Sequence, residues 1–236
     1  MKKLLYAGVV GPLLFIVVFL VEGLTRPGYS AWRHYVSQLA TGDGGWVQVV
    51  NFLVCGTLMI AFAIGLRQAL KGSRGSIGAP IVFGLFGTAL LVAGIFVTDP
   101  ALGYPVGAAK VHTAHGMIHG LAGLTAFTTL AACGFVMAWH FASMPGPRRW
   151  AVYSAGIGLL IVALFIASTA VSVLDERGIW TNAPTGFLQR ISIIGGWTWI
   201  AIVAWHLLNL RDTVESSSRM RAKIGPGADD VASEHA

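Results

Sequence analysis

Three histidines, His112, His115 and His119, stand close together near the start of one apolar segment. On a helix, residues turn by about 100° each, which puts His112 and His119 about 20° apart and His115 about 60° to one side. His115 and His119 are one helical turn apart, the spacing at which two imidazoles can bind one zinc ion. The spacing is typical of a metal site, of a site that handles protons or a ligand, and of histidines that are hydrogen-bonded within the fold.

Other polar residues are expected at the same depth. Asp99 lies at the end of an apolar segment, where Pro100 stops the helix. Ser37 and His34 lie between the first and second apolar segments. Like Asp99, they could complete a zinc site that two imidazoles leave open. Arg190 opens the last apolar segment, where it could pair with Asp99. We therefore predict one polar pocket with five candidate catalytic residues, two of them also metal ligands through their imidazoles: Ser37, Asp99, His115, His119 and Arg190.

Composition defines the elements that must position these residues. The chain of 236 residues is 55% hydrophobic and 11% charged, whereas a soluble protein is about 25% charged. Six apolar segments approach the length of about 20 residues that a transmembrane helix needs: 4–21, 46–69, 79–97, 112–141, 150–174 and 189–210. We predict an all-α bundle of six transmembrane helices over 1–211, followed by a disordered cytoplasmic tail over 212–236.

The distribution of Lys and Arg predicts the orientation of the bundle. With the N-terminus in the cytoplasm, eleven of the sixteen basic residues fall in cytoplasmic segments and five in outer ones, as the positive-inside rule requires. Both termini are then cytoplasmic, in the cell membrane. The outer connections, 22–45, 98–111 and 175–190, are longer and more polar than the inner ones, so we expect the pocket to open toward the exterior.

The first outer connection is expected to contain a short amphipathic α-helix over 30–40. Its apolar face would carry residues at helical spacing: Trp32, Tyr35, Val36 and Leu39. Its polar face would carry the residues between them: Arg33, His34, Ser37 and Gln38. Such a helix lies either in the headgroup plane or as a lid on the bundle, in which case Ser37 and His34 face the pocket.

Glycine spacing and the placement of basic residues indicate what the protein contacts. Gly116 and Gly120 are four apart, a spacing that lets a second helix approach closely, so their face is expected to point into the bundle. The pI is about 9.7, but the basic residues follow membrane topology rather than one face. We therefore expect the lipid bilayer and a lipid or small-molecule ligand as partners, and no nucleic acid.

A haem site is a further alternative. His140 and His206 lie late in the fourth and sixth segments, at similar predicted depth. Two imidazoles that face each other from different helices could bind a b-type haem. Neighbouring Trp139 and Trp205 also fit histidines that lie at the membrane interface.

Four short motifs, in this order, are similar to those of one family: Gly28-Tyr29-Ser30 with Val36-Ser37-Gln38-Leu39, Phe96-Val97-Thr98-Asp99, His115-Gly116-Met117-Ile118-His119, and Gly186-Phe187-Leu188-Gln189-Arg190-Ile191. Over 6–210 the chain resembles the prokaryotic membrane-protein family known as domain of unknown function 998. Gln38 and Gln189 stand where carboxylates are usual in that family. The resemblance implies a six-span membrane fold and no established activity.

Three classes of function follow from these patterns. We favour a multi-pass membrane protein without assigned activity, whose outer pocket binds a lipid, small molecule or ion. The alternative is a metal-dependent intramembrane hydrolase that uses a zinc-activated water against a lipid amide or ester. In the third class the polar residues only fix the packing of the helices.

Overall fold

The computed structural model describes the backbone of residues 2–224 and the side chains of residues 2–210. Six α-helices and one short 3₁₀ helix follow one another along the chain: α1 Lys2–Thr25, η1 Val36–Ala40, α2 Trp46–Ala69, α3 Gly78–Ile95, α4 Ala114–Ala142, α5 Arg149–Glu176 and α6 Thr185–Ile224. The described part of the chain contains no β-strand, only an isolated bridge between Ala101 and Tyr104. All six α-helices are long and apolar enough to cross a membrane. The predicted all-α membrane fold of six spanning helices is confirmed.

The helix ends differ from the expected ends by a few residues. The second span coincides with α2, whereas α4 begins at Ala114, after His112. The sixth helix continues past the boundary expected at 211, as far as Ile224. The remainder of the expected tail, 225–236, lies outside the described residues.

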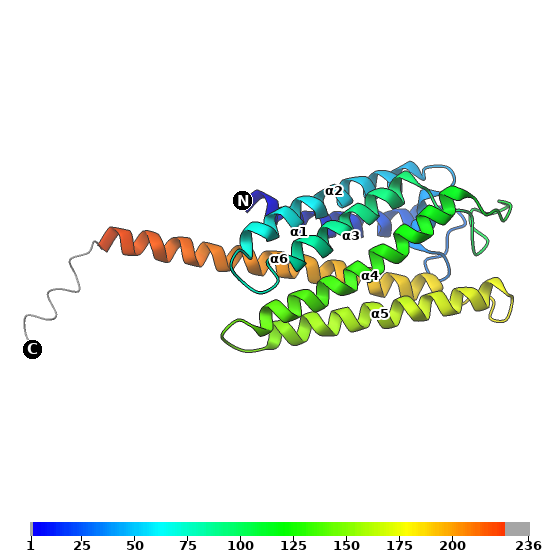
Figure 1. Cartoon of the computed structure of the whole chain (residues 1–236). Helices are drawn as coiled ribbons and strands as arrows, with labels where there is room; N and C mark the ends of the chain where they lie inside the picture. The colour runs from blue at the N-terminus through cyan, green and yellow to red at the C-terminus, as the bar shows by residue number, and fades with distance from the viewer. Residues whose placement is uncertain (1, 225–236) are drawn as a thin grey trace, which may run out of the picture.

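The helices pack in chain order around a closed ring. Each α-helix contacts the next one along the chain, and α6 returns to pack against α1. At one end of the bundle the helices are joined by the connections 26–45, 96–113 and 177–184, of which the first two are long; we call this the long-loop end. Short connections, 70–77 and 143–148, join the helices at the other end, the short-loop end (Figure 1).

Close contacts between helices depend on glycine. A Cβ atom at Gly56 of α2 would lie 2.8 Å from the Gly87 carbonyl oxygen of α3, and one at Gly87 would lie 2.7 Å from that of Gly56. A Cβ at Gly134 of α4 would lie 3.0 Å from the Gly158 Cα of α5. Without a hydrophobic driving force in lipid, such close backbone packing stabilises helix pairs through van der Waals contact.

The pair Gly116 and Gly120 does not have this role, and our expectation for it was wrong. A Cβ at Gly116 would collide with the Asp99 carboxylate in the α3–α4 connection, and one at Gly120 would meet nothing within 4 Å. Helix α4 runs beside α5 at the short-loop end and crosses to α3 at the long-loop end (Figure 1). Gly120 therefore lies on a stretch of α4 that no helix covers on that side.

Aromatic side chains fill the centre of the ring. Trp197 of α6 stacks on Phe15 of α1 with ring centroids 4.3 Å apart, and the edge of Phe86 from α3 completes the group at 5.3 Å. Trp197 and Phe86 are each 2% exposed. This layer forms the floor of the cavity described below.

The first connection folds differently from the expected α-helix. Only Val36–Ala40 is helical, as the 3₁₀ helix η1, while 31–34 forms turns. His34 and Gln38, expected on a solvated polar face, are 5% and 1% exposed. Their burial follows from contacts with the rest of the protein: the Gln38 side chain donates to the carbonyls of Ala101 and Tyr104. The segment is therefore packed onto the helix ends rather than amphipathic.

Candidate functional site

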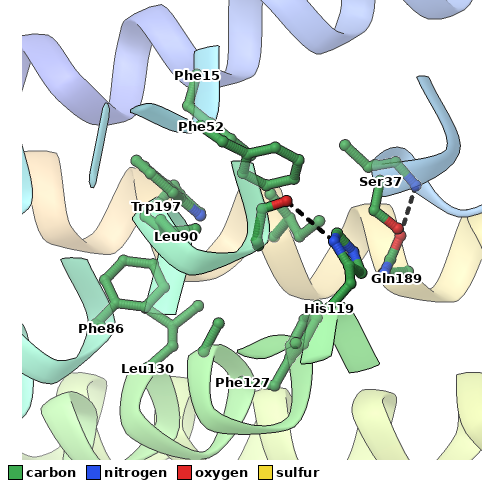
Figure 2. A pocket seen from close by; sticks show the side chains of 15 residues that line it. Phe15, Ser37, Phe52, Phe86, Leu90, His119, Phe127, Leu130, Gln189 and Trp197 are labelled. Carbon is green, nitrogen blue, oxygen red and sulfur yellow. Dashed lines mark hydrogen bonds between the residues drawn. The ribbon is translucent and has the colours of Figure 1, made fainter. Parts of the chain in front are cut away.

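A cavity of about 80 Å³ lies inside the ring, between the central aromatic layer and η1. Its walls come from α1, α2, α3, α4, α6 and η1, and are almost entirely aliphatic or aromatic. Three polar side chains also line it: Ser37, His119 and Gln189. Figure 2 shows these three together at one end of the cavity, with Trp197 and Phe86 at the other. The site is thus apolar with one polar end.

His119 has a fixed orientation in this cavity. Its Nδ1 lies 3.0 Å from the Ala93 carbonyl oxygen and 2.8 Å from that of Phe96, at the C-terminal end of α3. Carbonyl oxygens only accept hydrogen bonds, so we assign the proton of the neutral imidazole to Nδ1. The last carbonyls of a helix lack partners within the helix, which explains why they recruit this side chain. Nε2 then keeps a lone pair and can accept a hydrogen bond.

Gln189 and Ser37 keep hydrogen-bonding capacity as well. The Val36 backbone N–H donates to Oε1 of Gln189 at 2.8 Å, which assigns the amide orientation. The Gln189 NH₂ and the Ser37 hydroxyl have no hydrogen-bond partner among the described residues, and both side chains line the cavity. The polar end of the cavity therefore carries one free acceptor, one free amide donor and one hydroxyl.

The cavity reaches the surface on the flank of α4. Gly123 lines it, and a Cβ atom there would meet nothing within 4 Å, as at Gly120 one turn earlier. Further along, Phe127 of α4 stacks on Phe165 of α5 at 4.8 Å, and the two helices then approach closely. Because α4 diverges from α5 toward the long-loop end, no neighbouring side chain packs against this glycine stretch.

Asp99 lies outside the cavity and holds the start of α4. It accepts hydrogen bonds from the Thr113 backbone N–H and hydroxyl, both at 2.7 Å. Thr113 in turn caps α4 by accepting from the Gly116 N–H at 3.0 Å. The Thr113 hydrogen bonds hold the pKa of the Asp99 carboxyl below its ordinary value. Asp99 positions α4, and with it His119.

His115 also lies outside the cavity. Its ring is exposed and meets the edge of the Phe96 ring at 5.2 Å, whereas His119, one turn later, is 7% exposed. Among the residues that the structure describes, no three His, Cys, Asp or Glu side chains gather to hold a metal ion. Since Nδ1 of His119 is engaged, only Nε2 could bind zinc, and its neighbours in the cavity are a hydroxyl and an amide. These donors do not fit a zinc site.

Arg190 organises the first connection instead of joining Asp99. Its guanidinium donates to the carbonyls of Ala31 at 2.7 Å, His34 at 3.0 Å and Gly186 at 3.1 Å. It also donates to the Tyr29 hydroxyl, whose pKa is raised to about 12 by burial. The side chain is 7% exposed. Arg190 thus holds η1 in place above the cavity, as a positioning residue.

Charges at the long-loop end are paired around a second cavity of about 270 Å³. Arg33 donates to both carboxylate oxygens of Asp175, at 2.8 and 2.7 Å, and Lys110 pairs with Glu176. These pairs join the first two long connections to the end of α5. The second cavity therefore lies within a charged network that is already satisfied.

The two histidines considered for haem each contact protein groups. Nδ1 of His140 lies 2.8 Å from the Arg74 carbonyl oxygen in the α2–α3 connection. His206 stacks on Trp150 at 4.1 Å. Phe141 lies beside both, at 5.2 Å from the first ring and 6.0 Å from the second.

Of the five predicted site residues, the structure brings Ser37 and His119 to one cavity and places Asp99, His115 and Arg190 elsewhere. Gln189 was not predicted as a site residue. A signal was available, because Gln189, Ile193 and Trp197 are four residues apart and share one face of α6. That face carries two large apolar residues, so Gln189 is expected to point into the bundle with them.

Comparison with known proteins identifies a family but no activity. A family model described as "Protein of unknown function (DUF998)" matches residues 9–206. No curated protein and no solved structure matches the chain. The matched region includes every residue of the cavity, so the geometry of the cavity carries the functional argument.

Proposed function

The chain belongs to the DUF998 family, and from the geometry of its cavity we propose that this multi-pass membrane protein binds an amphiphilic lipid or lipid-like molecule. The supporting observation is a largely apolar cavity whose three polar side chains each keep a hydrogen-bond donor or acceptor without a partner. The apolar walls suit a hydrocarbon chain, and the polar end suits a head group.

Unused polar groups are costly in this environment. A polar group without a partner in a low-dielectric interior costs several kcal/mol, whereas the cost disappears when a ligand or water pairs with it. His119 is 93% buried by accessible area, being 7% exposed. Its free Nε2 therefore favours a ligand that offers a hydrogen.

The route of access also supports a ligand from the bilayer. The opening beside Gly120 and Gly123 faces the side of the bundle, where the exposed residues of α4 include Leu121 and Leu124, at 65% and 48%. A chain that lies between lipid tails can enter there without crossing water. The long-loop end faces the exterior in this proposal, because Lys71, Arg74 and Arg148 lie in the short connections.

In this function the residues have different roles. Ser37, His119 and Gln189 contact the head group, while Asp99 and Arg190 position the elements that carry them. No role is assigned to His115. Zinc-dependent hydrolysis is not the function that we propose, since the donors around His119 do not fit the metal.

Filling the cavity tests the proposal. Gly123→Leu places a side chain in open space inside it, and the same change at Gly156, on the exposed face of α5, is the matched control. Both changes replace helix glycines, so neither disfavours the helix. We expect native mass spectrometry of detergent-purified protein to show a bound lipid with the wild type and with Gly156→Leu, and at least about tenfold less with Gly123→Leu. Equal lipid occupancy in all three, or none in the wild type, would overturn the proposal.

A further inference from the structure

We infer that the ligand is a single hydrocarbon chain that ends in an O–H group, as in a long-chain alcohol or a fatty acid. The inference rests on the proposed function and specifies the chemical class of its ligand. It follows from the hydrogen-bonding groups at the polar end, from the charges around it, and from the size of the cavity.

One group at the polar end of the cavity, the His119 imidazole, accepts a hydrogen bond. Because Nδ1 of His119 is committed to the carbonyls of Ala93 and Phe96, Nε2 is an acceptor in the neutral ring. Its natural partner is a hydrogen donor on the ligand. An ester or ether oxygen has no hydrogen and would leave Nε2 unpaired, which lowers affinity by about tenfold for a buried group.

The other two groups at the polar end can donate hydrogen bonds. The free Gln189 NH₂ and the Ser37 hydroxyl need hydrogen-bond acceptors on the same head group. An alcohol oxygen donates one hydrogen and accepts two hydrogen bonds, and a carboxylic acid has a hydroxyl and a carbonyl. Both therefore match one acceptor and two donors at one end of the cavity.

Charge excludes the common phospholipid heads. Among the described side chains, no Lys or Arg lines the cavity. The nearest cation along α6, Arg190, donates instead to the carbonyls of Ala31, His34 and Gly186. A phosphate at the polar end would lose its hydration without gaining a fixed positive charge, and burying an unpaired charge is strongly unfavourable.

Size limits the chain. The cavity of about 80 Å³ is well below the roughly 300–1,000 Å³ of sites that enclose a whole ligand. It can enclose a small head and the first carbons of one chain. The rest of that chain would leave past Gly123 into the bilayer, and there is no room for a second chain beside it.

Competition binding tests the inference. Tritiated hexadecanol is bound to the purified protein in detergent and displaced by unlabelled compounds of equal chain length: hexadecanol, hexadecanoic acid, hexadecyl methyl ether and dipalmitoyl phosphatidylcholine. We expect the alcohol or the acid to compete about tenfold better than the ether, and the phospholipid to compete worst. The relative strength of alcohol and acid identifies which of the two heads the site prefers.

Two failures are distinguishable. If the ether competes as well as the alcohol, the O–H inference is overturned while chain binding stands. If the label does not bind, or binds equally to Gly123→Leu, the inference about the ligand is overturned, whereas the proposed function falls only if native mass spectrometry also shows no lipid that Gly123→Leu removes.

A variant connects the selectivity to the imidazole. His119→Phe should lower the alcohol-to-ether preference to near unity while the ether binds as before, a result that a merely structural role would not produce. If that variant does not fold, Ser37→Ala supplies the test: its hydroxyl can donate to an alcohol and an ether oxygen alike, so its loss should weaken both by a factor of about 3, and loss of the preference itself in this variant would overturn the assignment to the imidazole. Gly156→Leu must keep the full preference. An unchanged alcohol-to-ether preference in folded His119→Phe would overturn the inference.

Discussion

Two groups of polar side chains at the long-loop end of the bundle differ in one respect. The Arg190 guanidinium, beside the first connection, donates to three carbonyls and a hydroxyl, so both of its terminal nitrogens have partners. His119 and Ser37, in the cavity below, keep a free acceptor and a free hydroxyl. The first group fixes the fold of a connection, and the second is left able to bind something else.

The comparison shows how to separate structural from functional polar residues in a membrane protein. Burial does not separate Arg190 from His119, since both are 7% exposed. What differs is the hydrogen-bonding capacity that remains after folding. Experiments that remove members of each group therefore test the distinction directly.

The largest effect is expected at Arg190. Arg190→Ala leaves the Ala31 carbonyl without a donor, removes one donor from the carbonyls of His34 and Gly186, and removes the donor to the Tyr29 hydroxyl; an unsatisfied buried group costs about 1–3 kcal/mol. We expect the free energy of unfolding to fall by about 3 kcal/mol, measured by denaturant titration in detergent with tryptophan fluorescence. The matched control is Arg177→Ala, an exposed arginine at the same end of the bundle. Equal stability of the two variants would contradict a structural role for Arg190.

A smaller, pH-dependent effect is expected at His34. Its Nδ1 accepts from the Ser30 N–H at 2.9 Å, and burial lowers its pKa below the ordinary value of 6.5. The nearby Arg33 and Arg190 lower this pKa further, while Asp175 and the Leu102 backbone oppose them. Between the lowered pKa and 6.5 the unfolded chain binds more protons than the folded one, so stability rises with pH there and is lost as the pH falls.

Thermal unfolding between about pH 5 and about pH 8 measures this dependence. We expect the melting temperature of the wild type to drop on the acid side, and the drop to be reduced in His34→Gln. The exposed His115 provides the control, because His115→Gln should keep the acid-side drop. The same drop in all three proteins would show that His34 does not cause it.

The smallest effect on stability is expected in the cavity. The Ser37 hydroxyl has no hydrogen-bond partner among the described residues, so Ser37→Ala removes no interaction of the folded state. We expect the free energy of unfolding to stay within about 0.5 kcal/mol of the wild type, in the same titration that reveals the loss at Arg190. A loss of more than about 1 kcal/mol would place Ser37 with the structural group and weaken the comparison.

Part of the site could be predicted from sequence. His119 was identified from its helical spacing to His112 and His115, and Ser37 from the polar face that it was expected to share with His34. The roles of Asp99 and Arg190 could not be predicted, since their main partners are a backbone N–H, a threonine hydroxyl and loop carbonyls. Backbone groups occur at every residue, so sequence does not show which of them a side chain will meet. Opposite charges suggested an ion pair that the described structure does not form.

The six spanning helices were determined by the sequence alone, because a long apolar run must satisfy its backbone within a helix when it lies in lipid. Tertiary structure decided which polar groups retained hydrogen-bonding capacity. The crossing of α4 from α5 to α3 turns His119 toward the end of α3 and leaves Gly123 uncovered. Spacing along the chain predicted neither the orientation of His119 nor the exposure of Gly123. Both depend on the angle at which helices pack, and contacts between residues distant in sequence set that angle.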